Sequence, residues 1–382
     1  MEDTTRVPSL VEYLAQIPEY RAARGRRHPL LALLLLVCVA MLCGARGQSA
    51  IADWGRFHGQ PWLRRLGFTR GRGPSQPTLS RLFRAVPHAT VEAALGRWAE
   101  QALRLCPPPP GALEGLAVDG KTLRGSKRRG ATDAPLLAAC SHRFGVVLGQ
   151  VGVPDKTNEI GATRDLLLAL LLEGRVVTAD ALLTQREIAQ TILAGRGDYL
   201  LAVKANQPQL RADVVSAFAP GADDTGVVGA ACTVTQHGGR IEWRTLTATT
   251  ALVGYSAWPG LRQALKLERR VLHKATGHVL RQEIAYAVTS CTPERATPAQ
   301  LLALWRGHWT IENRLHYIRD VTLDEDRATT RAGHAPQVMA AFRNTIIGLH
   351  HRLGAANIAA ACRRCAARPA FALAAIRLTD FE

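Results

Sequence analysis

Three acidic residues stand in settings where a carboxylate is unusual. Asp119 lies within an apolar, strand-like segment, where charged side chains are disfavoured. Asp180 ends the short apolar run 176–180, and ligand sites in open α/β sheets gather beyond the carboxyl ends of strands. Glu312 follows in a helical stretch. Magnesium is usually held by a few carboxylates together with water and phosphate oxygens, and three carboxylates from two strands and one helix would suit a site for two such ions.

Each acid also has a simpler interpretation. An aspartate at a strand end commonly caps a turn or pairs with a nearby arginine, and a helical glutamate is commonly solvated. The chain offers no zinc spacing of His and Cys, no P-loop and no GxSxG elbow to compete for a catalytic role. Cys362 and Cys365 form a lone CxxC, whereas structural zinc needs four ligands, so we interpret the pair as incidental.

The elements that must position these acids fall into two regions. Residues 8–104 read as helical, with a capping box expected at Ser9, and a second box is expected at Thr184 in the region after the linker. The apolar run 30–43 is too short for a membrane span of roughly 20 residues, so we expect a buried helix. After the proline-rich linker 106–111, strands at 115–123, 176–180 and 198–203 alternate with helices, which is typical of an α/β sheet. Residues 223–290 alternate as a β-rich insertion, and one long helix capped by Thr297 carries Glu312.

The charge balance points to a polyanionic partner. The 382 residues carry a formal net charge of +17 and a pI near 10.3. Between Arg21 and Arg84 there are twelve Arg, no Lys and one acid, Asp53, giving a net +11. Codon bias could favour Arg over Lys but does not explain the excess of base over acid. This segment is the best candidate for phosphate contacts, and its apolar helix argues against a membrane-surface role.

Several sequence blocks, in order, resemble one family. They are AVDGKTLRG at 117–125, KTNEI at 156–160, ADA at 179–181, KANQ at 204–207 and HWTIENRLH at 308–316. Over nearly the whole chain the sequence resembles the H-repeat-associated, ISAs-type insertion-sequence transposases, which have a DDE catalytic domain of ribonuclease-H-like fold. The resemblance implies that Asp119, Asp180 and Glu312 are catalytic and hold two Mg²⁺ or Mn²⁺ ions.

Candidate DNA contacts follow from the same resemblance. Related transposases carry a Tyr-Arg-Glu-Lys signature, and the matching positions here are Trp305, His308, Glu312 and Arg319, whose spacing would place them on one helical face. For each cationic candidate, a solvated charge or a structural ion pair is the alternative. The candidates are Lys121, Arg124, Lys156, Lys204, Arg240, Arg244, His308 and Arg319.

The sequence therefore predicts an α/β protein with three parts. A basic helical region, 1–105, associates with DNA. A ribonuclease-H-like catalytic domain, 113–350, carries a β insertion at about 216–295, and a helical tail occupies 351–382. We expect a cytoplasmic transposase that cleaves DNA at the element's terminal repeats and joins the cut ends to target DNA. It is expected to act as a homodimer on DNA and to have no membrane partner. The alternatives are an inactive or domesticated DNA-binding derivative and a metal-dependent nuclease without strand transfer.

Overall fold

A computed structural model describes residues 9–123, 135–153, 158–219 and 226–377. The chain forms two compact units. The first unit contains residues 1–107, 120–156 and 311–382, and the second contains 108–119 and 157–310. The first crossing between units follows Pro107, within the predicted proline-rich linker. The chain also passes from one unit to the other directly after Asp119 and directly before Ile311, which precedes Glu312.

The first unit is built around one apolar helix. Its N-terminal elements are α1 (Leu10–Ala15), a 3-10 turn (Ala23–Gly25), α2 (Leu30–Leu42), α3 (Gln48–Arg65), α4 (Gln76–Ala85) and α5 (His88–Arg104). All residues of α2 except Leu31 are buried, which confirms the predicted core helix. No helix within the described residues is long and apolar enough to cross a membrane.

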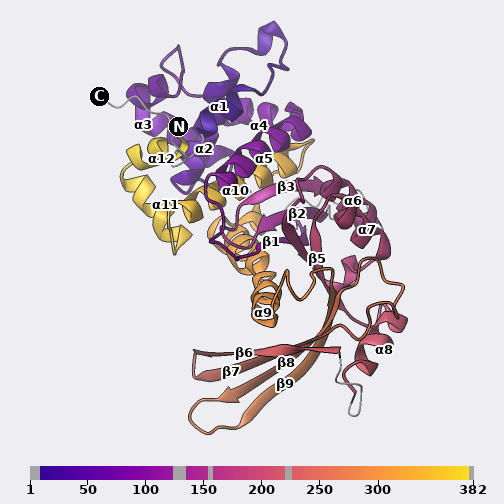
Figure 1. Ribbon diagram of the computed structural model, residues 1–382. Helices are drawn as coiled ribbons and strands as arrows, with labels where there is room; N and C mark the ends of the chain where they lie inside the picture. The colour runs from indigo at the N-terminus through magenta and orange to yellow at the C-terminus, as the bar shows by residue number, and fades with distance from the viewer. Residues whose placement is uncertain (1–8, 124–134, 154–157, 220–225, 378–382) are drawn as a thin grey trace. The chain divides into compact units, whose positions relative to one another are not determined.

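The last helices of the chain complete this core. They are α10 (Ala335–Arg352), α11 (Ile358–Ala367) and α12 (Ala370–Ile376), and all three contact α2. Figure 1 shows these yellow and orange helices packed beside the indigo ones. Cys362 and Cys365 are buried thiols, and the Cys43 Sγ donates to the Cys365 carbonyl at 3.3 Å. The CxxC pair is therefore part of the packing, as its interpretation as incidental requires.

A short β-hairpin packs against two of these helices. Strands β2 (Pro135–Ser141) and β3 (Val147–Gly152) pair antiparallel, and β3 contacts α5 and α10. At Gly96 of α5, an added Cβ would lie 2.7 Å from the Leu148 carbonyl oxygen. The glycine thus permits the close approach of helix and strand that this packing needs.

The second unit holds the predicted parallel strands. Strand β1 (Glu114–Thr122) begins there and pairs in parallel with β4 (Arg175–Ala179), which pairs in parallel with β5 (Asp198–Val203). Helices α6 (Glu159–Leu168) and α7 (Arg186–Ala194) provide the connections that parallel strands require. The predicted strand positions are confirmed. The predicted box at Thr184 is wrong, because Gln185 precedes α7 and the Thr184 hydroxyl donates to the Ala202 carbonyl at 2.5 Å.

The predicted β-rich stretch forms an antiparallel meander. Strands β6 (Val227–His237), β7 (Arg240–Thr249), β8 (Gln263–His273) and β9 (Val279–Thr289) follow α8 (Pro208–Ser216), and β9 joins β5 to give the order β1-β4-β5-β9-β8-β7-β6. Figure 1 shows the four long strands side by side. Their inner ends pack on α9 (Pro298–Gly307) through a cluster that includes Leu246, Leu265 and Leu301.

The single long helix predicted after Thr297 is wrong in its second half. Thr297 does cap α9 with the expected box, since its hydroxyl accepts from the Gln300 N–H and Gln300 reaches back. The α-helix ends at Gly307, a weak helix former. Two π-helical turns, Glu312–His316 and Ile318–Thr322, follow. A π-turn shifts the helical phase, so the regular spacing assumed for Trp305, His308, Glu312 and Arg319 does not hold.

The predicted cap of the first helix is also wrong. Ser9 precedes α1 but makes no side-chain capping bond. Its hydroxyl instead donates to the Arg377 carbonyl oxygen at 3.4 Å, beside the end of α12. A contact between the two ends of the chain cannot be read from a local four-residue pattern, which explains the error.

Candidate active site

Two of the predicted acids lie at matching positions on adjacent parallel strands. Val118 of β1 is paired with Ala179 of β4, and the next residues along the two strands are Asp119 and Asp180. Neighbouring strands are about 4.8 Å apart, so the two backbone positions are close. Asp119 is half-buried and Asp180 is exposed. Asp119 therefore lies within β1 and Asp180 directly after the end of β4, where their oxygen atoms could serve as ligands of a divalent cation.

Asp180 is held as an anion. Its Oδ1 accepts hydrogen bonds from the Ala181 backbone N–H at 2.6 Å and from Lys204 Nζ at 3.0 Å. Partial burial raises the pKa of Asp180, but these two bonds, with the positive charges of Lys204 and His308, outweigh burial and leave the pKa below its usual value. Both bonds go to Oδ1, which leaves Oδ2 as a ligand atom for a cation.

A cleft of about 580 Å³ opens beside Asp180 within the second unit. His308 lies in its wall with Nδ1 3.1 Å from the Thr178 hydroxyl. The cleft combines one carboxylate, cationic side chains and aromatic rings, a mixture that suits a nucleic-acid strand. Its charged and aromatic lining comprises Asp180, Lys204, Arg211, Tyr286, Trp305, His308 and Trp309.

Glu312 lies at the start of the first π-helical turn and is exposed. The buried His316 donates from Nδ1 to the Glu312 Oε2 at 3.2 Å. This hydrogen bond, with a smaller contribution from the Lys121 charge, holds the pKa of Glu312 below its usual value despite some burial. The π-turn therefore presents an ionised, oriented carboxylate, and such turns are frequent at functional sites.

Comparison with known proteins identifies the family. A model described as "Transposase DDE domain" matches residues 110–347, and another described as "DDE_Tnp_1-associated" matches residues 11–99. The chain belongs to the DDE transposase family.

Curated relatives narrow this to the H-repeat-associated, ISAs-type transposases. The transposase is 29% identical over 354 residues to Putative transposase YncI of Escherichia coli O157:H7, covering 90% of this chain and 87% of that protein. It is 28% identical over 349 residues to H repeat-associated putative transposase YhhI of Escherichia coli K12, covering 89% of each. A piggyBac transposase synaptic complex with hairpin DNA is 11% identical at a TM-score of 0.40, covering 97% of this chain and 77% of that one. A likeness of that size does not establish a shared fold.

Two residues predicted to contact phosphate, Arg319 and Lys121, instead form ion pairs within the first unit. Arg319 has no exposed surface, and its guanidinium pairs at 2.7 Å with Glu325. Lys121 is 9% exposed and its Nζ lies 2.6 Å from the Asp320 carboxylate. The structure corrects the prediction for Arg319, because a fully enclosed guanidinium cannot reach a phosphate. Lys121 is held in an ion pair, which was the alternative weighed for every cationic candidate.

The remaining predicted contacts are spread over several elements. Lys204 lines the cleft, and Arg240 is exposed at the start of β7. Arg244 of β7 pairs with Glu242 at 2.6 Å. Arg124 and Lys156 lie outside the described residues.

Sequence reasoning missed two features of the site. Glu325, which follows the third predicted acid in sequence, is 3% exposed and pairs with both Arg319 and Arg343. It therefore supplies the negative charge for two buried arginines. Arg211 and Tyr286 of the cleft were not singled out either. Their distances from Asp180 in the sequence form no recognisable motif. They reach one cleft because α8 and β9 pack together in the fold.

Proposed function

We propose that this chain is an active transposase that cleaves DNA at the ends of an insertion sequence and joins the freed ends to target DNA. The observation that carries the proposal is the placement of Asp119 and Asp180 directly after the paired Val118 and Ala179, in a chain of the DDE transposase family. Glu312, ionised and fixed by His316, is the third acid.

We further propose the predicted three-part organisation. Residues 1–105 form a DNA-associated helical domain, residues 113–350 a ribonuclease-H-like catalytic domain, and residues 351–382 a helical tail. The parallel run β1-β4-β5 supports the catalytic assignment, and the meander β6–β9 supports a β insertion at about 216–295.

The acids fit divalent metal ions by their chemistry. All three offer carboxylate oxygens, the ligands that Mg²⁺ and Mn²⁺ prefer, and Asp180 and Glu312 are ionised well below neutral pH. When bound, two such ions would activate the attacking oxygen and neutralise charge on the leaving oxygen. Asp119, Asp180 and Glu312 would hold them. Lys204 keeps Asp180 ionised and oriented until a cation arrives.

The reaction needs no covalent bond between protein and DNA. In the first step a water oxygen attacks the phosphorus at the element end, the bond from phosphorus to the 3′ oxygen breaks, and a 3′-hydroxyl and a 5′-phosphate result. In the second step that 3′ oxygen attacks a target phosphodiester, and the target's own 3′ oxygen leaves with a proton. One phosphodiester is broken for each one formed, so joining requires no energy source. Lys204, Arg211 and His308 in the cleft would contact the phosphates of the bound strand.

The partners follow from this chemistry. The transposase would bind the element's terminal inverted repeats and target DNA in the cytoplasm. Because two ends must be held together for joining, we propose a homodimer on DNA. The surplus of base over acid, +17 overall, supplies the attraction to phosphate.

A joining assay tests the proposal. Purified protein is incubated with labelled DNA carrying an element end and with unlabelled target DNA, in Mg²⁺ and in EDTA. We expect metal-dependent nicks at the element end and labelled joined products, both lost in Asp119→Asn while DNA binding persists. Nicking without joining would indicate a nuclease. Binding without cleavage in either Mg²⁺ or Mn²⁺ would indicate a regulator or an inactive copy.

A further inference from the structure

Helix α4 turns its cationic side away from the core. Leu79, Leu82 and Phe83 are buried, where α4 contacts α3 and α10. Arg81 and Arg84 lie on the opposite side and are exposed, and so is Gln76 at the first turn. In a helix, positions three and four apart share a face, so Gln76, Ser80 and Arg84 form one polar row and Arg81, three residues before Arg84, lies beside its later half.

This surface lies in the most basic part of the chain and is poorly neutralised. Asp53, the one acid between residues 21 and 84, is already paired with Arg56 at 2.9 Å. Arg72 and Arg81 form no ion pair within the described residues. The exposed cations of α4 and of the segment before it therefore lack an acidic partner of their own, and a polyanion would supply one.

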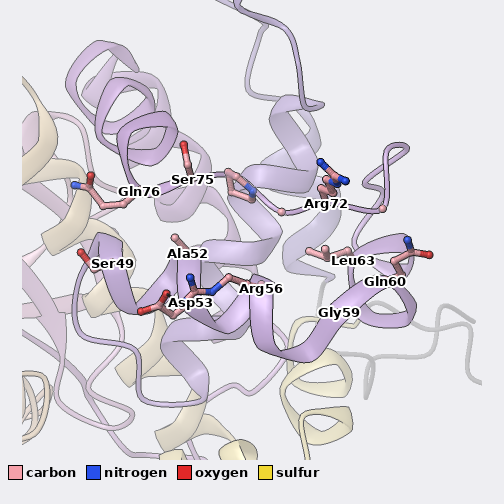
Figure 2. A pocket seen from close by; sticks show the side chains of 14 residues that line it. Ser49, Ala52, Asp53, Arg56, Gly59, Gln60, Leu63, Arg72, Ser75 and Gln76 are labelled. Carbon is pink, nitrogen blue, oxygen red and sulfur yellow. Dashed lines mark hydrogen bonds and ion pairs between the residues drawn. The ribbon is translucent and has the colours of Figure 1, made fainter.

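A hollow of about 540 Å³ adjoins the start of α4. It lies between α3 and residues 71–76, as Figure 2 shows. Its floor is made by buried residues such as Ala52 and Leu63. Its polar rim carries Arg56, Gln60, Arg72, Ser75 and Gln76, together with Asp53, whose carboxylate pairs with Arg56. An apolar floor with a cationic, amide-bearing rim suits the sugar and phosphate of a nucleotide.

Glycines fix the geometry of this hollow. A Cβ added at Gly73 would lie 3.5 Å from the carbonyl carbon of Gly55, so the segment before α4 runs in close contact with α3. A Cβ added at Gly71, which has a φ of 64°, would lie 3.0 Å from the Gln60 side chain. The segment before α4 thus packs against the α3 backbone at Gly73, and the Gln60 side chain lies against Gly71.

We propose that α4 enters the major groove of double-stranded DNA, with Gln76 and Arg81 facing base edges while Arg56 and Arg72 hold the adjoining backbone. This inference rests on the proposed function in taking DNA as the substrate. Reading helices place their N-terminal residues against bases, and Gln and Arg are the side chains that form paired hydrogen bonds with adenine and guanine. The major groove of B-form DNA admits an α-helix, whereas that of A-form RNA does not.

Binding in EDTA tests this reading independently of catalysis. Fluorescence anisotropy compares a duplex from the element end with a scrambled duplex of equal composition. We expect Arg81→Lys to weaken binding to the end duplex about tenfold and to leave scrambled binding nearly unchanged, because lysine keeps the charge and loses the planar fork. Arg72→Ala should weaken both duplexes alike and reduce the salt slope by about 0.9. Arg363→Ala, an exposed arginine of α11, is the control that should change neither.

Two results would overturn the proposal. Equal weakening of both duplexes by Arg81→Lys would reduce Arg81 to a backbone contact, and unchanged binding in Arg81→Ala would remove α4 from the interface. Thermal unfolding of each variant excludes misfolding as the cause. The same end duplex in Mg²⁺ reports separately on the proposed function. Selective binding without cleavage would leave the α4 assignment standing and contradict catalysis, whereas cleavage with α4-independent binding would do the reverse.

Discussion

A partly buried carboxyl group makes the stability of the first unit depend on pH near neutrality. Glu92 of α5 accepts hydrogen bonds at Oε1 from Gln150 of β3 at 2.6 Å and from Gln337 of α10 at 2.8 Å. Asn344 of α10 donates to the Gln150 Oε1 at 2.7 Å, which extends the network. Burial raises the pKa of Glu92 to about 7, and the two amide donors offset only part of that effect.

The size of the effect follows from proton linkage. The folded pKa of about 7 lies above the ordinary 4.5, so the folded state holds the proton more tightly than the unfolded state. The stability that Glu92 contributes is present below pH 4.5, falls as the pH rises toward 7, and is constant above it. At 1.36 kcal/mol per pH unit, the loss between pH 4 and pH 8 is about 3 kcal/mol.

Glu92→Gln isolates this contribution. The amide oxygen can still accept from Gln150 and Gln337, but the side chain no longer ionises. We expect the variant to match the wild type in free energy of unfolding near pH 4.5 and to exceed it by up to about 3 kcal/mol at pH 8. Urea titrations followed by tryptophan fluorescence measure this, since the buried Trp98 lies on the same helix. A difference between the two proteins that is independent of pH from 4 to 8 would refute the reasoning.

Three further substitutions test the packing of single elements in urea or thermal unfolding. Glu325→Gln, which removes the acid between two buried arginines, should cost about 3–5 kcal/mol, and a loss below about 1 kcal/mol would show that the arginines find other partners. Gly96→Ala should cost about 1–3 kcal/mol by pressing a methyl group on the Leu148 carbonyl, and an unchanged Tm would mean that α5 shifts freely. Thr297→Ala should cost about 1 kcal/mol by removing the box at α9, with Thr297→Ser as the control that restores the hydroxyl.

Local patterns predicted those parts of the fold that depend on neighbours in sequence. The apolar run of α2 predicted a buried helix, and the alternation of residues 223–290 predicted strands, which the structure shows as β6–β9. Asp119 and Asp180 were found because a charge within an apolar strand, or directly after one, needs a reason, and the pairing of Val118 with Ala179 supplies the geometry.

The features that the sequence could not give depend on distant partners. Burial raises the pKa of Glu92, and its hydrogen-bond partners Gln150 and Gln337 lie 58 and 245 positions away in the sequence, so no local pattern announces its environment. Arg319 lies beside the predicted acids in sequence, yet Glu325 holds it in the interior. The π-turn at Glu312 also has no propensity signal, so the extrapolated helix could not be right beyond Gly307.

The central claim is that Asp119, Asp180 and Glu312 together hold the catalytic ions. Mn²⁺ binding, followed by electron paramagnetic resonance, together with nicking of element-end DNA, tests it most directly in Glu312→Gln. The matched control is Glu187→Gln, an exposed glutamate on α7. We predict that Glu312→Gln loses bound Mn²⁺ and all nicking while keeping its Tm, and that the control keeps both activities. Wild-type Mn²⁺ binding and nicking in Glu312→Gln would contradict the assignment.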